Sequence, residues 1–247
     1  MQMSVGDVFP TKNFGDVEVV KYVNSTNVTV RFLNTGTIKS SRAAQIRSGL
    51  VQDNFATTVY GVGYIGNTKT SVNAKHKPAY VLWKDMLKRC YDKEYQETHH
   101  CYRDCYVSDC FKSFENFEVW CEKQVGFNEV GFRLDKDILL KGNKVYSPTT
   151  CSFVPYEVNG LFVIQQQNRG ELPVGVSFNV TKSRYVVRMS TKSHCKHLSV
   201  HDTVDEAFSA YKQAKEKYIQ QLANKWKDQI DPRVYDALMN WEVNITD

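Results

Sequence analysis

Two carboxylates stand two positions apart in the segment LDKDILLKGNKVYSPTTCSFVPYEVN, residues 134–159. The segment indicates a strand that carries Asp135 and Asp137, a Lys-Gly-Asn loop, a second strand and the start of a helix. Residues two apart in a strand point to one face of the sheet, so these carboxylates are expected side by side. Carboxylate oxygens are ligands that Mg2+ prefers. The two carboxylates are therefore candidate ligands of a divalent cation, and the alternative is a solvated strand end paired with Lys136 and Lys141.

A cluster of histidines and cysteines lies upstream, in the segment THHCYRDCYVSDC. Such a cluster raises the question of zinc. Cys101, Cys105 and Cys110 lack the paired C-x2-C knuckles of a structural zinc site, and aromatic residues interrupt them. Three buried thiols are therefore expected, and a structural Zn2+ site that includes His99 or His100 is the alternative.

Two helices are expected on either side of this cluster. In AYVLWKDMLKRCYD, Tyr80, Trp83, Leu87 and Tyr91 recur at the spacing of one helix face. A second helix is expected in SFENFEVWCEKQ, with Ser113 as its N-cap. We expect these helices to hold the carboxylate segment in place.

Short alternating runs of β-branched and polar residues fill the N-terminal part of the chain. In DVEVVKYV and VTVRFLNTG the apolar residues fall at every second position, and NSTN between them supplies turn residues, a pattern typical of a β-hairpin. We expect an SH3-like β-barrel over residues 1–53, then a connector over residues 54–78 that is rich in Gly, Asn, Thr and Lys. Such barrels mostly serve as binding modules, so a protein partner is expected, with DNA contact as the alternative.

The last third of the chain predicts three short strands followed by a long helix. Thr203 is a natural N-cap for this helix, and Glu206 three positions later completes a capping box. The strand SRYVVRMS alternates, so one set of its side chains packs on the helix and the other faces outward. The expected inward residues are Tyr185, Val187 and Met189, and the expected outward residues are Arg184, Val186, Arg188 and Ser190.

The expected outward face of this strand is basic. A sheet of two or three strands can enter the major groove of DNA, which is about 12 Å wide, with arginine contacting guanine or phosphate. Turns and the edge strand supply the expected phosphate contacts. The alternative is an ordinary solvated sheet face, in line with the modest net charge. The predicted DNA-binding residues are Lys182, Arg184, Arg188, Ser190, Lys192, His194 and Lys196.

Three separated segments occur in the order that one family of nucleases shows. YVLWKDMLKRCYD, FKSFENFEVW and LDKDILLKGNKVYSPTTCSFV resemble the HNH-type free-standing homing endonucleases of phages, from Tyr80 to about Gly160. The resemblance implies a ββα-metal core within residues 79–165, in which one cation stabilises the leaving oxygen and a base activates water. The implied catalytic residues and ligands of Mg2+ or Mn2+ are Asp135, Asp137 and Asn159. Asn143 is a further catalytic candidate, for the bridging role of the family's central asparagine.

The chain departs from that family at two positions. Its strand lacks the usual histidine base, and Thr150 stands where the family has asparagine. The candidate replacements for the base are His99, His100 and His76, or a carboxylate with a raised pKa. Two interpretations therefore stay open. In the first the core cleaves DNA with a substitute base, and in the second the core has lost its catalytic activity.

Residues 170–247 resemble the AP2 DNA-binding domain, whose three-stranded sheet lies in the major groove and is backed by one helix. The usual L-G-x-F before the helix appears here as LSVHDT, so Leu198 fits while the Gly and the Phe do not. The matching framework residues are Gly175, Val176, Arg184, Tyr185, Thr203, Glu206, Ala207, Ala210 and Tyr211.

Composition sets the outer limits of these predictions. The 247 residues are 42% apolar and 24% charged with a net charge of +5, which indicates a globular chain and permits nucleic-acid binding. There is no apolar leader segment and no run of about 18 apolar residues, so neither a signal peptide nor a membrane span is expected. The seven cysteines, an odd number, are expected to be reduced thiols of a cytoplasmic protein, in the host cytoplasm if a phage encodes it.

The sequence thus predicts an α+β protein with a small N-terminal β-barrel, a central HNH-like core with flanking helices, and a C-terminal AP2-like sheet and helix. The predicted function is a metal-dependent endonuclease that acts on double-stranded DNA. The alternative is a catalytically inactive HNH-derived factor that binds DNA or protein, as a regulator, an anti-defence protein or a structural adaptor. A zinc-stabilised interaction module is the third interpretation.

Overall fold

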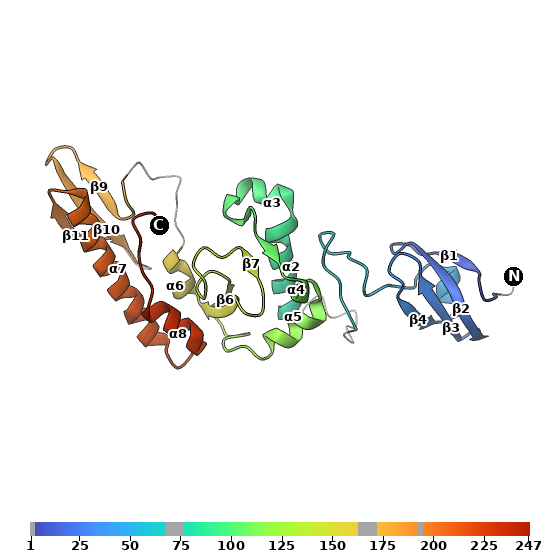
Figure 1. Cartoon of the computed structure of the whole chain (residues 1–247). Coiled ribbons are helices and arrows are strands. Elements are labelled where there is room, and N and C mark those ends of the chain that lie inside the picture. The colour runs from blue at the N-terminus through green and yellow to red at the C-terminus, as the bar shows by residue number, and fades with distance from the viewer. Residues whose placement is uncertain (1–2, 68–76, 163–171, 192–194) are drawn as a thin grey trace. The chain divides into compact units, whose positions relative to one another are not determined.

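The computed structural model describes residues 3–67, 77–162, 172–191 and 195–247. It is an α+β chain with several small sheets (Figure 1). The chain divides into two compact units, Met1–Val119 and Trp120–Asp247. Each unit has a hydrophobic core of its own.

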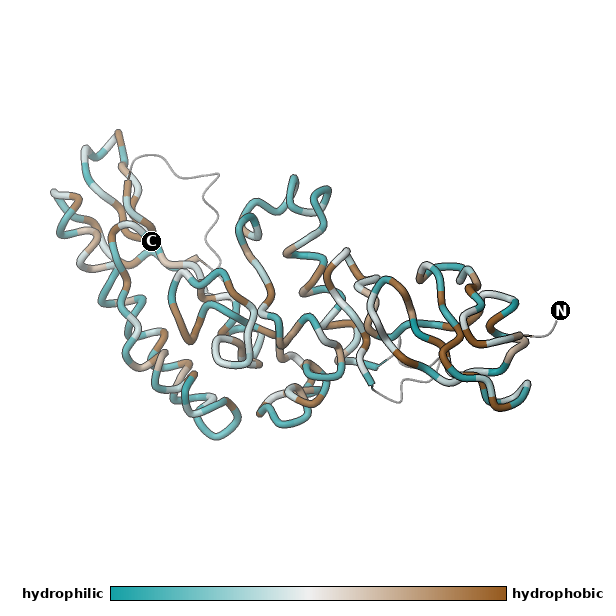
Figure 2. Tube along the Cα trace, turned by 45° about the vertical axis from the view of Figure 1, so that its right-hand side comes forward, coloured by the Kyte–Doolittle hydropathy of each residue, from teal (hydrophilic) through white to brown (hydrophobic). Residues whose placement is uncertain are grey.

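The first unit begins with a four-stranded antiparallel sheet in the order β1-β2-β3-β4. The predicted hairpin is confirmed, because β2 pairs with β3 and the Asn24 side chain accepts hydrogen bonds from the backbone N–H groups of Thr26 and Asn27. Figure 2 shows hydrophobic and hydrophilic residues alternating along these strands. The inward residues Val17, Val19, Val28, Val30 and Phe32 are fully buried. The strands are β1 (Val8–Pro10), β2 (Asp16–Asn24), β3 (Asn27–Phe32) and β4 (Ile38–Ser41).

This sheet does not close into a barrel among the described strands, since β1 and β4 stay at its two edges. The edge strands are short, with three and four residues, and offer few groups for a further ladder. The core is covered instead by α1 (Ala43–Arg47) and the following segment, through Ala43, Ile46 and Val51. The expectation of a closed SH3-like barrel is therefore corrected to an open sheet with a covering helix.

Helices make up the rest of the first unit. The helix expected from the spacing of Trp83 and Leu87 is confirmed, and both side chains are fully buried. The Trp83 indole Nε1 donates a 2.7 Å hydrogen bond to the carbonyl oxygen of Phe111. A side chain at Gly63 would collide with Trp83 and Leu87, so the Gly-rich loop before these helices packs closely on them. The elements are α2 (Pro78–Tyr91), α3 (Lys93–Thr98), η2 (His100–Tyr102), β5 (Tyr106–Val107), α4 (Asp109–Lys112) and α5 (Phe114–Cys121), and the boundary between the units falls within α5.

The second unit begins with two antiparallel strands, β6 and β8, joined by a long loop and followed by a single helical turn. This is the predicted order of strand, loop, strand and helix. Gly142 in the Lys-Gly-Asn turn has φ +76°, which suits glycine. The elements are β6 (Phe132–Asp135), β7 (Val145–Tyr146), β8 (Ser152–Pro155), α6 (Tyr156–Asn159) and η3 (Gly160–Phe162).

The predicted three strands and long helix are confirmed in the last third of the chain. The three strands form an antiparallel sheet in the order β11-β10-β9, with β10 in the centre. Thr203 caps the long helix, because its side chain accepts a hydrogen bond from the backbone N–H of Glu206. The elements are β9 (Val176–Asn179), β10 (Arg184–Ser190), β11 (Cys195–His201), α7 (Val204–Trp226) and α8 (Pro232–Met239).

One hydrophobic core unites the whole second unit. Val154 and Val158 from the β8–α6 segment belong to the same buried cluster as Val187 of β10 and Ile219 of α7. Gly175 has φ +75°, and a side chain there would collide with the Tyr211 ring, so the sheet and α7 approach closely. The strand pair β6–β8 is therefore packed into the same body as the β9–β11 sheet.

Within the described ranges, no helix combines the length and the apolar character needed to cross a membrane.

Candidate functional site: the carboxylate turn and the β9–β11 sheet

Asp135 is the last residue of β6, and its side chain caps the turn that follows. Its Oδ1 atom accepts hydrogen bonds from the backbone N–H groups of Asp137 and Ile138, both at 2.8 Å. Burial raises the pKa of Asp135 above its ordinary value, and these two backbone donors offset part of the rise. This carboxylate therefore serves first to shape its own turn.

Asp137 lies beyond the end of β6, so the expectation that both carboxylates share one strand face is wrong. The strand ends at Asp135 because its side chain takes the N–H groups that would otherwise continue the ladder. Asp137 instead pairs with Lys136, whose Nζ atom donates to Asp137 Oδ1 at 2.7 Å. This contact fits the predicted alternative, in which a carboxylate pairs with Lys136.

Asn143 holds the other side of the loop. Its amide nitrogen donates to the carbonyl oxygens of Lys136 and Val145, and its Oδ1 atom accepts from the backbone N–H of Val145. The residue is 8% exposed. The amide that was expected to bridge catalytic groups is used to close the loop.

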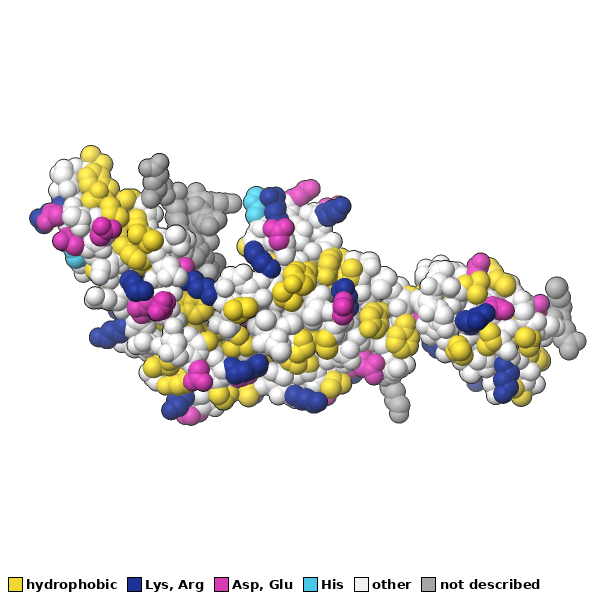
Figure 3. All heavy atoms as spheres, viewed as in Figure 1, with side chains coloured by type: hydrophobic (Ala, Val, Ile, Leu, Met, Phe, Trp, Pro, Cys, Tyr) yellow, Lys and Arg dark blue, Asp and Glu magenta, His cyan; other side chains and the backbone are white. Residues whose placement is uncertain are grey.

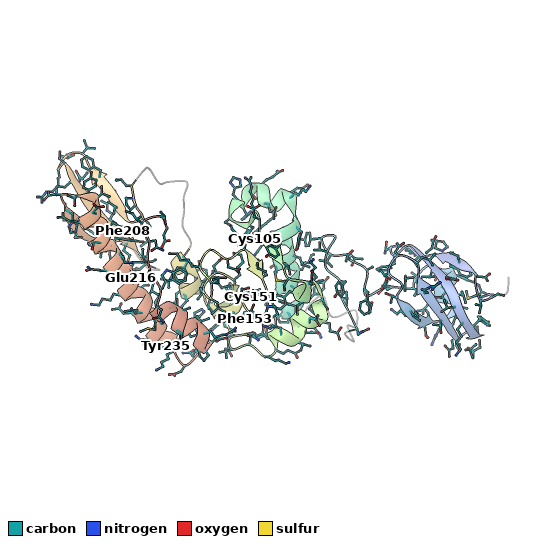
Figure 4. All side chains as sticks on the ribbon, in the orientation of Figure 1. Cys105, Cys151, Phe153, Phe208, Glu216 and Tyr235 are labelled. Carbon is teal, nitrogen blue, oxygen red and sulfur yellow. The ribbon has the colours of Figure 1, made fainter. Side chains whose placement is uncertain are left out.

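Thr150 is also engaged in local structure, and Asn159 lies where it was predicted. Thr150, which stands at the family's asparagine position, donates its hydroxyl to the carbonyl oxygen of Val145 at 2.8 Å. Asn159 is the last residue of α6, one turn into the helix as predicted. Burial, with a smaller contribution from the Asp135 carboxylate, raises the pKa of Cys151 to about 12. Cys151 lies directly before β8, beside Phe153 (Figure 4).

Two candidate histidine bases, His99 and His100, lie in the first unit, on the surface around α3 and η2. His99 is exposed and stacks on Tyr95 with ring centroids 3.9 Å apart. His100 is exposed, and its Nε2 atom is 2.6 Å from the carbonyl oxygen of Glu97. His76 lies outside the described residues. His99 and His100 are therefore each held by their own helical segment.

The expectation of three buried thiols in the neighbouring segment is wrong for two of them. Cys105 is buried, but Cys101 and Cys110 are exposed, because they lie in the short turns η2 and α4 on the surface. Within the described part of the chain, no group of three or more His, Cys, Asp or Glu side chains is arranged to hold a metal ion.

The carboxylate turn does not fit a bound divalent cation in the arrangement described. One oxygen of Asp135 is committed to two backbone N–H groups, and one oxygen of Asp137 is committed to an ammonium group. The buried positive charge of Lys136 lies where it would repel a second cation. The Mg2+ or Mn2+ site of Asp135, Asp137 and Asn159 stays a prediction, and these contacts do not favour it.

The outer face of the β9–β11 sheet carries the other predicted site. Arg184, Arg188 and Ser190 of β10 are exposed, as expected. Cross-strand partners share a face in an antiparallel sheet, so His197, the partner of Arg188, lies on this face too. His197 is exposed and was missed by the sequence prediction. Its place depends on a bulge opposite Val187 and Arg188, which alternation alone cannot locate.

One residue differs from the expected pattern of this sheet, and another lies on its helix side. Val186 was expected to face solvent but is only 6% exposed, since it lies in the central strand between Ser177 and Val200. Lys196 is exposed but pairs with Met189, which places it on the helix side of the sheet. Lys196 lies on the edge strand β11, as predicted, and its phosphate contact stays a prediction.

The turns around the sheet add to its positive charge. Lys182 is exposed in the turn between β9 and β10. Lys192 and His194 lie outside the described residues. In the sequence from Leu172 to His201 every charged residue is Lys or Arg. In Figure 3, by contrast, side chains of both signs are mixed over α7 and α8.

Arg184 and Arg188 differ in their partners. Arg184 forms an ion pair with Asp202, with Nε and Oδ1 2.7 Å apart. Arg188 forms no ion pair with any of the described residues. Arg188 is therefore the outward arginine that is most available to a ligand.

No protein family model, curated protein or solved structure matches this chain.

Proposed function

We propose that the protein binds double-stranded DNA through the outer face of the β9–β11 sheet. The observation that supports this most is the segregation of charge, because the sheet segment carries only basic residues while the helices behind it carry both signs. Positive charge on one face attracts the phosphate backbone. The supporting side chains are Arg188, Arg184, Lys182, Ser190 and His197.

The shape of the sheet suits a groove of DNA. A narrow antiparallel sheet fits the major groove, which is about 12 Å wide, and presents the side chains of one face to the base edges. Arg188 lies on the central strand, where a side chain meets the floor of the groove, and Lys182 lies in a turn at one end. Arginine in the centre favours base contact, and lysine at the end favours phosphate contact.

The proposal leaves cleavage aside, as in the expected alternative of an HNH-derived DNA-binding factor that does not cut. The contacts of Asp135, Asp137 and Asn143 serve the loop, so they support a scaffold more than a reaction centre. The HNH-like and AP2-like descriptions of the two parts, and a protein partner for the N-terminal sheet, stay predictions.

Arg188→Ala tests the proposal. We expect it to weaken binding of purified protein to a pool of random-sequence duplexes by roughly 5- to 150-fold, the loss that goes with one well-placed arginine of about 1–3 kcal/mol. Fluorescence anisotropy measures the affinity at several salt concentrations. The salt slope should fall by about 0.9 if the contact is to phosphate and stay unchanged if it is to a base.

Lys217→Ala is the matched control, because Lys217 is exposed on α7, away from the sheet segment. It should leave affinity within twofold of the wild type. If Arg188→Ala folds normally by circular dichroism and binds DNA as well as Lys217→Ala does, the sheet is not the DNA-binding surface.

A further inference from the structure

Lys136 is a buried cation at the centre of the carboxylate turn. The residue is 6% exposed, although lysine is almost never fully buried unless it is paired. Its Nζ atom donates to Asp137 Oδ1 at 2.7 Å and to the carbonyl oxygen of Asn143 at 2.8 Å. It also lies over the ring of Tyr146, 5.8 Å from the centroid.

The oxygens around Lys136 are of the kind that bind hard divalent cations. A carboxylate and a backbone carbonyl both contact its ammonium group, and such oxygens are the usual ligands of Mg2+ and Ca2+. The same loop is closed by Asn143, which ties the Lys136 carbonyl to Val145. The ammonium group therefore joins the two sides of the loop, between Asp137 on one side and Asn143 on the other.

We infer that the ammonium group of Lys136 replaces a divalent cation in this loop, so that the loop is held by an internal, covalently tethered charge. A cation there neutralises Asp137 and draws the Asn143 carbonyl inward, and lysine does both without a metal. The inference concerns only the second unit and does not rest on DNA binding.

The first test is thermal unfolding of the wild-type chain in EDTA, in Mg2+ and in Mn2+. An internal cation predicts the same Tm in all three solutions, within the error of the measurement. A Tm that rises in Mn2+, with the rise lost in Asp137→Asn, would overturn the inference, because a metal would then be using this carboxylate. This comparison needs no variant at Lys136.

Lys136→Met is the second test, since methionine has a similar length without the charge. We expect its Tm to fall by roughly 5 °C, because the buried Asn143 carbonyl and the half-exposed Asp137 carboxylate both lose their donor. Mn2+ should restore part of that loss, because Asp137 and the Asn143 carbonyl are then left without their cation. Lys144→Met is the control, since Lys144 is exposed in the same loop and should respond to neither change.

Direct titration of Mn2+ by electron paramagnetic resonance completes the test. Lys136→Met is expected to bind Mn2+ more tightly than both the wild type and Lys144→Met. If Lys136→Met loses stability but gains no affinity for Mn2+, the ammonium group does not replace a cation and the inference fails. A wild-type Tm in Lys136→Met would overturn it equally.

Discussion

The carboxylate turn and the β9–β11 sheet use their polar side chains in opposite ways. In the turn, Asp135, Asp137 and Asn143 all bond to groups of the same loop. On the sheet, Arg188 faces solvent and forms no ion pair with the described residues. Side chains of a type suited to catalysis can therefore be fully engaged in local hydrogen bonds, whereas a basic side chain that faces water is available to a partner.

Removing Asn143 should produce the largest effect on the turn. Asn143→Ala deletes three hydrogen bonds, to the Lys136 carbonyl and to the N–H and carbonyl groups of Val145, although the Val145 carbonyl keeps its bond from Thr150. We expect a loss of about 2–4 kcal/mol in the free energy of unfolding, measured by urea denaturation. Lys144→Ala, at an exposed site next to it, should change stability by at most about 0.5 kcal/mol. Equal stability of both variants would mean that Asn143 does not hold the loop.

Asn143→Ala also separates the two regions. At temperatures where the variant stays folded, its affinity for DNA should match that of the wild type, because Asn143 contacts only its own loop. A loss of DNA binding without a loss of fold would contradict the division into a structural turn and a binding sheet.

Releasing Arg184 should have a smaller and opposite effect on the sheet. Asp202 holds Arg184 in an exposed ion pair and adds a negative charge beside the basic face. Asp202→Asn is expected to strengthen DNA binding about two- to fivefold at low salt, with the gain shrinking as salt screens it. Asp228→Asn removes a charge from an exposed site just beyond α7 and should leave affinity unchanged. Weaker binding by Asp202→Asn would show that the ion pair positions Arg184 for DNA.

The smallest effect on stability is expected for the carboxylate of Asp231, which lies at the start of α8 and outside both regions. A side-chain hydrogen bond from Arg233 lowers the pKa of Asp231 below its ordinary value of 3.8. A lowered folded-state pKa means that the charged carboxylate stabilises the fold above that ordinary value, and that this stabilisation is lost as pH falls through the folded-state pKa. Asp231→Asn should therefore lower Tm slightly at neutral pH, with the difference disappearing in acid. If the Tm of Asp231→Asn stays below that of the wild type at a pH below the folded-state pKa, the charge of Asp231 is not the cause.

Much of the fold could be predicted from local pattern. The hairpin of β2 and β3 follows from strict alternation, and α2 and α7 follow from helical spacing, since Val17, Val30, Trp83 and Ile219 are all fully buried. The open edge of the N-terminal sheet could not be predicted, because closure depends on pairing between distant strands.

The candidate sites were predicted less completely. Asp135 and Asp137 were expected on one strand face, but the Asp135 side chain ends the strand by capping the turn, a competition that alternation does not reveal. His197 was missed because a bulge sets its face. Arg184 and Arg188 are exposed as predicted, because the extra residue of the bulge lies in β11 and β10 itself continues without interruption.

Incubation with supercoiled plasmid tests whether the protein binds DNA through the β9–β11 sheet without cutting it. The purified protein is incubated with plasmid in Mg2+, Mn2+ or EDTA, beside Arg188→Ala and Asp137→Ala. We expect the wild type and Asp137→Ala to retard the plasmid in a gel without nicking it, and Arg188→Ala to retard it far less. Metal-dependent nicks that disappear in Asp137→Ala would contradict a purely structural role of the carboxylate turn, because the turn would then be a working metal site.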